Sequence, residues 1–190
     1  MSLLIKRIID ILFSLTAIVI LLPLWILIAI LIKLSSSGPV FYTHRRVGKG
    51  SKEFNCFKFR SMYVNSDQNT LVSDPTDPRV TKIGKFLRKT SIDETPQLIN
   101  VLFGNMSIVG PRPALPSQVE QFTKEDFDKL LVKPGLTGWT QISGRNSLPY
   151  KKRMELDSWY AKNWNLFLDF QILIKTIFVL FKEEEIYDVK

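Results

Sequence analysis

The apolar run ILFSLTAIVILLPLWILIAILI, residues 11–32, decides how this 190-residue chain is organised. Its 22 residues carry no charge, and Asp10 and Lys33 bound it. A membrane helix needs about 18–20 such residues. Sixteen of these are Leu, Ile, Phe or Val, and each favours insertion into lipid by roughly 0.3–0.6 kcal/mol. Because the run is too long for a signal peptide and no small-residue cleavage site follows it, we expect residues 11–32 to remain buried in lipid.

Pro23 stands in the middle of this run. A proline there removes one backbone donor and clashes with the carbonyl four residues before it, so we expect the helix to bend. Positive residues flank the run on both sides: Lys6, Arg7, Lys33, Arg45, Arg46, Lys49 and Lys52. The positive-inside rule draws both flanks to the cytoplasmic side. A re-entrant helix-break-helix with its break at Pro23 is therefore the favoured interpretation, and a single kinked span is the alternative.

The overall charge also points to an anionic environment. A net charge of +8 and a pI near 9.6 favour nucleic acid, an anionic membrane surface or a phosphate-bearing substrate, with a merely solvated basic surface as the alternative. One cysteine, Cys56, excludes an intramolecular disulfide framework, and with one histidine, His44, a Cys/His zinc site is disfavoured. Any metal should have oxygen ligands, which indicates Mg2+, with Mn2+ as a second choice.

Beyond the apolar run, short aromatic and β-branched segments predict a small β-hairpin. PVFYTHRRV at 39–47 and EFNCFKFRSM at 53–62 are joined by the turn-rich GKGSK. Its outward basic residues are expected to bind phosphates or to face lipid headgroups: Arg45, Arg46, Lys58 and Arg60. Residues 65–78, with two Asp-Pro pairs, are expected to form a surface loop.

The remaining elements are mostly helical. The pattern predicts helices at 81–89, 96–103, 117–131 and 150–163. The segment at 104–117 is repeatedly broken by Gly and Pro, and the Gly-rich segment at 131–147 predicts a loop with a short strand. Residues 165–182 are apolar almost all round but interrupted by charges, as is typical of an interfacial helix lying on the bilayer.

Together these elements predict an α+β fold that is predominantly helical. We expect a re-entrant membrane hairpin at 1–37, a cytosolic or interfacial catalytic domain at 38–165, and a C-terminal interfacial helix at 166–190 packed on that domain. No appended domain is evident, so the chain is expected to be the minimal catalytic unit.

The stretch RKTSIDETPQLINVLFGNMSIVGPRP, residues 88–113, carries the candidate chemistry. It contains two adjacent carboxylates, Asp93 and Glu94. The spacing from Ser91 to Glu94 matches a capping box, so the acids could simply begin a helix. With Thr95 as N-cap, however, the next residue is a proline at the favoured first helical position, and the acids then lie just before the helix. Function and capping remain equal alternatives on spacing alone.

A carboxylate can attack phosphorus only if the repulsion between two anions is cancelled, which Mg2+ and well-placed arginines achieve. Attack by an aspartate gives an acyl phosphate. Three arginines lie in or beside Gly- and Pro-punctuated segments: Arg88, Arg112 and Arg145. The planar guanidinium suits a diphosphate, although a single arginine is more often only a surface residue.

With these motifs the chain resembles the bacterial sugar transferase family, the monotopic phosphoglycosyl transferases that start glycan assembly on polyprenol phosphate. The resemblance runs the whole length, through KRIID, Pro23, GPVFYTHRRVG, FKFRSM, SIDETPQLINVLFGNMSIVGPRP, KPGLTGWTQISGRN and MELDSWY. Many relatives carry serine before the hairpin proline, where this chain has Leu22. The bend must then depend on Pro23 and packing.

The resemblance implies a two-step exchange. Asp93 would attack the β-phosphate of a UDP-sugar and release UMP, and polyprenol phosphate would then take the phosphosugar from the enzyme. Glu94 would help hold Mg2+ or activate the acceptor, with both acids as metal ligands. The arginines that would bind phosphates are Arg88, Arg112 and Arg145. Asp157, in MELDSWY, is a weaker candidate for a supporting contact.

The implied location is the cytoplasmic face of the bacterial inner membrane, and the implied partners are a UDP-sugar, polyprenol phosphate and membrane lipids. Nucleic acid is not expected, because no binding motif for it is present, and monomer and homodimer both stay open. Sugar choice is expected to depend on loops such as 65–78 or 135–149. The alternatives are a ternary-complex transferase without a covalent intermediate and a non-catalytic membrane-surface scaffold.

Overall fold

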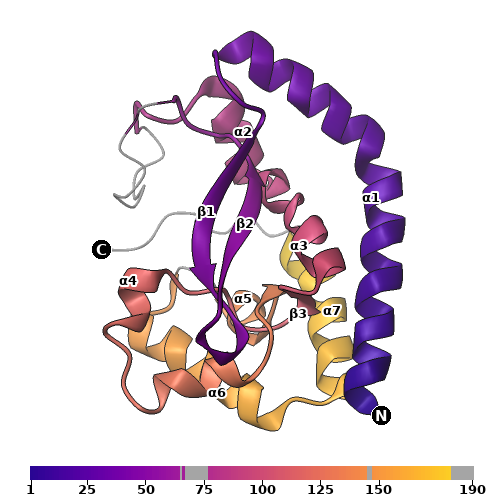
Figure 1. Cartoon of the computed structure of the whole chain (residues 1–190), viewed down its shortest axis with the longest axis vertical. Coiled ribbons are helices and arrows are strands. Elements are labelled where there is room, and N and C mark those ends of the chain that lie inside the picture. The colour runs from indigo at the N-terminus through magenta and orange to yellow at the C-terminus, as the bar shows by residue number, and fades with distance from the viewer. Residues whose placement is uncertain (65, 67–76, 145–146, 181–190) are drawn as a thin grey trace.

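The structure is a computed structural model that describes residues 1–64, 66, 77–144 and 147–180. It is mostly helical, with a small antiparallel hairpin, as the sequence predicts. A long helix lies along one side of the remaining elements (Figure 1). The α-helices and strands run in the order α1 (Ser2–Ser35), β1 (Phe41–Val47), β2 (Glu53–Phe59), α2 (Lys82–Lys89), α3 (Gln97–Phe103), β3 (Ser107–Val109), α4 (Pro116–Val119), β4 (Gly135–Thr137), α5 (Trp139–Ile142), α6 (Tyr150–Asn163) and α7 (Leu166–Leu180).

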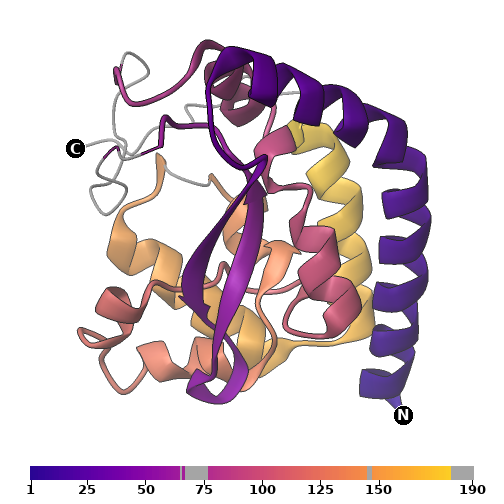
Figure 2. The same ribbon diagram turned by 45° about the horizontal axis from the view of Figure 1, so that its top comes forward.

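Helix α1 is one continuous helix of 34 residues that contains Pro23. It bends along its length, so that one end turns over toward α2 (Figure 2). The predicted break is therefore only a bend, because a single proline removes one hydrogen bond and the helix continues on both sides of it. In the described part of the chain α1 is the one helix that is long and apolar enough to cross a membrane.

Both ends of α1 are fastened to the same domain. At its beginning, Lys6, Arg7 and Asp10 bond to residues between 101 and 109. At its end, Arg60 donates to the carbonyl oxygens of Ile32, Ser36 and Ser37.

Arg60 was expected to face outward, but it is buried, with 4% of its surface exposed. That expectation is wrong because the last carbonyls of a helix lack partners within the helix, and this guanidinium supplies donors to them.

Strands β1 and β2 form the predicted hairpin, with Phe41 paired to Phe59 and Val47 to Glu53. A short 3-10 turn, η1 (Lys49–Ser51), connects them. Helix α3 holds the hairpin through the amide of Asn100, which accepts from the backbone N–H of Phe57 at 3.0 Å and donates to the carbonyl of Asn55 at 2.7 Å. This buried amide fastens the edge of β2 to α3.

The interior differs from the prediction in two places. Strand β3 was not predicted, and it pairs in parallel with β4 at the centre of the domain. The single helix expected at 117–131 is wrong: only α4 and a 3-10 segment, η3 (Asp126–Leu131), form there. Helix α6 has the predicted bounds. The surface loop expected at 65–78 falls almost entirely outside the described residues.

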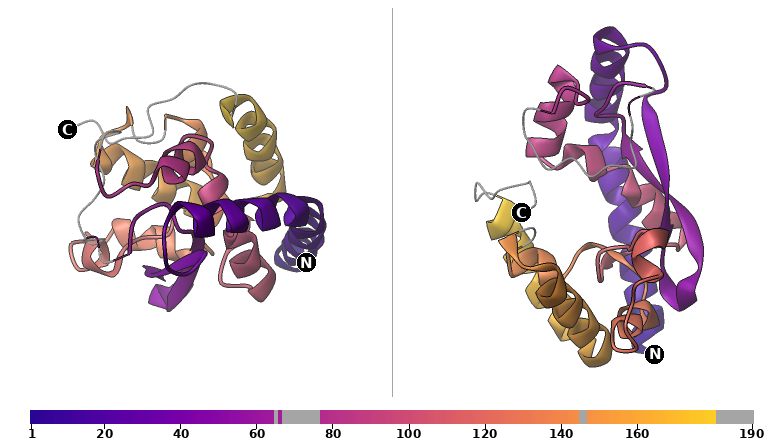
Figure 3. Two further views of the ribbon diagram at one scale, coloured as in Figure 1. Left: turned by 90° about the horizontal axis from the view of Figure 1, so that it is seen from above. Right: turned by 90° about the vertical axis from the view of Figure 1, so that its left-hand side faces the viewer.

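Helix α7 packs on the domain through Leu168 and Ile172, which are buried. Its outward side chains are large, apolar and exposed: Phe167, Phe170, Ile174, Ile177 and Phe178. The hairpin and α7 lie on opposite faces of the domain (Figure 3). The bulk of the domain therefore separates α7 from the hairpin.

Candidate active site

The two candidate acids lie on a single 3-10 turn, η2 (Ile92–Glu94), between α2 and α3. Ser91, which ends the preceding segment, has a left-handed backbone with φ 56°. Its side chain makes no capping hydrogen bond, so the capping-box hypothesis is wrong. Helix α3 starts only at Gln97, and both acids lie before it, as predicted. The turn that carries the two acids is therefore not the N-terminal cap of α3.

Glu94 is held by two cations. Lys58 Nζ lies 2.7 Å from Oε1, and Arg112 Nη2 lies 3.0 Å from the same oxygen. Burial raises the pKa of Glu94, but the charges of Arg112 and Lys58 and their hydrogen bonds outweigh it, so the pKa is well below its usual value. The charge of Glu94 in turn raises the pKa of Arg112. Glu94 is therefore a fixed anion.

Asp93 is in the opposite state. It is 7% exposed, and none of the hydrogen bonds or ion pairs within the described chain engages its carboxylate. Burial and the adjacent charge of Glu94 raise the pKa of Asp93 to about 6, against the opposing charges of Lys58, Arg88 and Arg112. The charged form is thus present at neutral pH, surrounded by positive charge and without a partner. Such a carboxylate is suited to nucleophilic attack.

A small pocket opens beside Glu94. Its lining includes His44, Arg46, Cys56, Lys58 and Arg112. Burial and the nearby cations, Arg46 first, lower the pKa of His44 to about 3, so its imidazole is neutral. Burial raises the pKa of the Cys56 thiol, which makes it a packing residue here rather than a reactive one.

The structure brings some of the predicted site residues together and leaves others apart. Arg112 contacts Glu94, and Arg88 lies in the last turn of α2, where its charge lowers the pKa of Asp93. Arg145 lies outside the described residues.

Asp157 was predicted to give a supporting contact, and the structure places it apart from the pocket beside Glu94. It is buried and accepts from Lys129 at 2.8 Å and from Thr140 at 2.6 Å. Its contacts fasten α6 to η3 and α5.

Sequence reasoning missed the role of one face of the hairpin. Lys58 and Arg46 were expected to point outward, whereas both line the pocket beside Glu94 together with His44. The available signal was the strand alternation, because residues 44, 46, 56 and 58 share one face in the register of the hairpin. The sequence does not say which face is turned inward.

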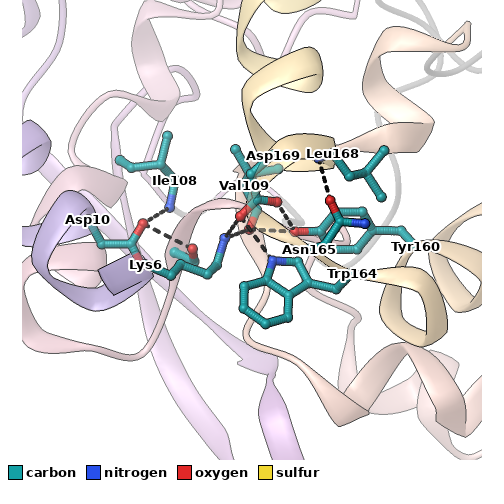
Figure 4. Close-up of polar contacts among 10 residues, drawn as sticks. Lys6, Asp10, Ile108, Val109, Tyr160, Trp164, Asn165, Leu168 and Asp169 are labelled. Atoms are coloured by element: carbon teal, nitrogen blue, oxygen red, sulfur yellow. Dashed lines mark hydrogen bonds and ion pairs between the residues drawn. The ribbon is translucent and has the colours of Figure 1, made fainter. Parts of the chain in front are cut away.

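A buried polar network joins the first turns of α1 to β3, α6 and α7 (Figure 4). Asp169 accepts from Lys6 at 2.5 Å, from Tyr160 at 2.5 Å and from Trp164 at 2.9 Å. Lys6 and Tyr160 also donate to the carbonyl of Val109.

Asp10 extends this network from α1 to β3. Its Oδ1 accepts from the hydroxyl of Ser107 at 3.0 Å and from the N–H of Ile108 at 2.9 Å. Since β3 leads directly into the Pro111-Arg112-Pro113 segment, the first turns of α1 help to fix where Arg112 lies.

Asp93 and Glu94 supply too few ligands to bind a magnesium ion without a substrate. The described residues contain no group of three or more His, Cys, Asp or Glu side chains that could hold a metal. Magnesium in phosphate-transfer sites needs only one or two carboxylates, with water and substrate phosphates supplying the other oxygens. Asp93 offers two oxygens that no described residue binds, and Glu94 shares its oxygens with Lys58 and Arg112. The residues therefore fit the ion only together with a phosphate-bearing substrate.

Comparison with known proteins places the sequence in a family. The sequence model of the bacterial sugar transferase family matches residues 1–183. The chain belongs to this family.

Three curated relatives illustrate the similarity. The UDP-galactose-lipid carrier transferase of Erwinia amylovora and the undecaprenyl-phosphate galactose phosphotransferase of Salmonella typhimurium are each 42% identical over 96% of this chain. The exopolysaccharide production protein ExoY of Sinorhizobium fredii is 43% identical over 90% of it. The chain spans 41% of the length of each of the first two relatives and 83% of the third.

Proposed function

We propose that this chain is a phosphoglycosyl transferase that moves a phosphosugar from a UDP-sugar to polyprenol phosphate and releases UMP. The observation that carries this proposal is Asp93: a buried carboxylate without a partner among the described residues, beside an acid that two cations hold ionised. The names of the relatives support the substrate class, since they refer to UDP-galactose and undecaprenyl phosphate. Another relative, of Xanthomonas campestris, is named as a UDP-glucose:undecaprenyl-phosphate transferase.

The first step is attack by a carboxylate oxygen of Asp93 on the β-phosphorus. A bond forms between that oxygen and phosphorus, and the bond to the oxygen bridging the two phosphates breaks, so that UMP leaves with the electron pair. The product on the enzyme is an acyl phosphate that carries the sugar. Arg88, Lys58 and Arg112 lower the barrier, because their charges offset the anion on the approaching phosphate.

The second step regenerates the enzyme. A phosphate oxygen of the polyprenol phosphate attacks the same phosphorus, and the bond to Asp93 breaks. The lipid diphosphate sugar forms, and the carboxylate returns to its starting state. Because Asp93 is 7% exposed, water has little access to it, which protects the acyl phosphate from hydrolysis.

Asp93 and Glu94 are the residues that would hold Mg2+ together with the substrate phosphates. When bound, the ion neutralises negative charge on the phosphate oxygens. Glu94 keeps its own charge because Lys58 and Arg112 lower its pKa.

We further propose that α1 enters and leaves the membrane on one face, the cytoplasmic one. Both of its ends bond to the same domain, through Lys6 and Asp10 at one end and Arg60 at the other. A helix fastened in this way cannot place its ends on opposite sides of a bilayer unless one set of contacts breaks. Single cysteines placed near each end of α1, in a Cys56→Ser background, test this topology by their accessibility to labelling. Labelling from opposite sides of the membrane would overturn the proposal.

The decisive test of the activity is to trap the intermediate. Protein incubated with a UDP-sugar labelled in the β-phosphate, without lipid acceptor, should retain the label and release UMP. Asp93→Asn should do neither, and label retained in that variant would exclude Asp93 as the nucleophile. A ternary-complex enzyme with Glu94 as base would release UMP only after polyprenol phosphate is added. A scaffold would show no turnover, and its membrane binding would be the same in Asp93→Asn.

A further inference from the structure

The pocket beside Glu94 holds hydrogen-bonding atoms that the described part of the chain does not use. Both imidazole nitrogens of His44 are buried without a partner there, and so is Nε of Arg46. Buried polar groups of folded proteins are nearly always paired. These atoms therefore point to a partner from outside the chain.

The two side chains are held in a fixed arrangement. His44 and Arg46 lie two residues apart on β1, so they share the face of the hairpin that lines the pocket. The imidazole stacks on Tyr42, with ring centroids 5.5 Å apart and an interplanar angle of 9°. Arg46 Nη1 donates to the carbonyl of Pro113 at 3.4 Å. Both groups are thus oriented before any ligand arrives, which lowers the entropic cost of binding.

The charges around the pocket favour an anion. Three cations, Arg46, Lys58 and Arg112, face one carboxylate, that of Glu94, and the neutral imidazole can donate one N–H. The pocket has room for about one water-sized group. That size matches a single phosphate oxygen.

We propose that His44 and Arg46 form a subsite that binds one oxygen of a phosphate ester, one position removed from the phosphorus that Asp93 attacks. This inference rests on the proposed function. Glu94 lines the pocket and Asp93 does not, which favours a phosphate next to the one that Asp93 attacks. Two reactants carry such a group: the nucleotide through its α-phosphate, and the lipid acceptor through its own phosphate.

The test compares two substitutions of the same side chain. His44→Phe keeps a flat ring to stack on Tyr42 but removes both nitrogens, and His44→Gln restores one donor and one acceptor. Thr43→Val is the matched control, because Thr43 is exposed on the opposite face of the same strand. The full-length protein in detergent is titrated calorimetrically with UMP, with inorganic phosphate and with a short-chain polyprenyl phosphate. UMP release and melting temperature are measured on the same preparations.

We expect His44→Phe to weaken binding of one phosphate-bearing probe about tenfold, the effect of one lost hydrogen bond to a charged group. We expect His44→Gln to recover most of the lost affinity and Thr43→Val to bind the probe as tightly as the wild type. Weaker UMP binding assigns the subsite to the nucleotide, and weaker polyprenyl phosphate binding assigns it to the acceptor.

Unchanged binding of all three probes in a folded His44→Phe overturns the proposal. A lowered melting temperature with unchanged binding does the same, since His44 is then only a packing residue. If His44→Phe does not fold, Arg46→Lys takes its place, because it keeps the charge but lacks Nε–H. If binding of a probe depends on His44 but the wild-type protein releases no UMP from any UDP-sugar, the proposed function is refuted and the phosphate subsite still stands.

Discussion

Asp93 and Asp169 are both buried aspartates close to cations, and they are equally exposed at 7%. Asp169 accepts hydrogen bonds from Lys6, Tyr160 and Trp164, so its charge is compensated. Asp93 accepts none within the described chain, and its pKa is raised to about 6. Burial alone therefore does not tell a structural acid from a reactive one. What separates them is whether the protein itself fills the acceptor positions.

The largest effect should come from Asp93→Asn. The amide has nearly the same shape but cannot form an acyl phosphate, so UMP release should fall by at least about a thousandfold. Melting temperature should stay equal or rise, because a buried charge without a partner is removed. A discontinuous UMP assay and thermal unfolding of the same preparations measure both. If the variant loses activity only because it melts, Asp93 belongs with Asp169 and the comparison fails.

The substitution Asp169→Asn should lower the stability of the protein. Asp169→Asn leaves the partly buried ammonium of Lys6 without its counter-ion. Removal of one partner from a fully buried pair costs about 3–5 kcal/mol, so the loss should approach the lower end of that range. Denaturant unfolding in detergent measures the change. The double variant Lys6→Met/Asp169→Asn should be more stable than Asp169→Asn alone, since no unpaired charge remains. A double variant that is even less stable would show that the hydrogen bonds of Lys6 matter more than its charge.

These two sites also mark what the sequence could reveal. The hairpin and α6 have local signals, such as strand alternation and helical periodicity, and these predictions are confirmed. The Asp-Glu pair lies before α3 as predicted, but the N-cap of that helix is Pro96 and not Thr95. The partners of Asp169 and the inward face of the hairpin depend on contacts between distant segments. Lys6 was interpreted as a topological charge beside a membrane run, although it is bonded to Asp169 and Val109. No local pattern distinguishes these uses.

The raised pKa of Asp93 should be visible in the pH dependence of both stability and activity. Between about pH 4 and 6 the folded protein keeps a proton on Asp93, whereas the unfolded chain has already released it. The free energy of unfolding that Asp93 contributes therefore falls as pH rises through this window, by at most about 1.4 kcal/mol per pH unit. Activity changes in the opposite direction, because only the carboxylate attacks. First-turnover UMP release should fall about tenfold per unit below pH 6.

The matched control for that profile is Asp93→Asn, whose unfolding free energy should lack this part of the pH dependence. Urea unfolding at a series of pH values between 4 and 7 gives the comparison. A wild-type activity profile that stays flat down to pH 5 would mean that the carboxylate of Asp93 is not the titrating nucleophile.

The smallest effect should come from Asp10→Asn. Asp10 accepts from Ser107 and Ile108, and an asparagine oxygen can accept the same two bonds. Only the charge is lost, and hydrogen bonds to neutral acceptors are weaker by about 1 kcal/mol. Denaturant unfolding should show a loss of that size, whereas Asp10→Leu should lose more because both donors are left unpaired. A much larger loss in Asp10→Asn would mean that charge, and not acceptor geometry, holds α1 against β3. One substitution, Asp to Asn, is therefore expected to remove the chemistry at residue 93, to unbalance an ion pair at residue 169 and to be nearly tolerated at residue 10, because only the first two positions depend on the charge itself.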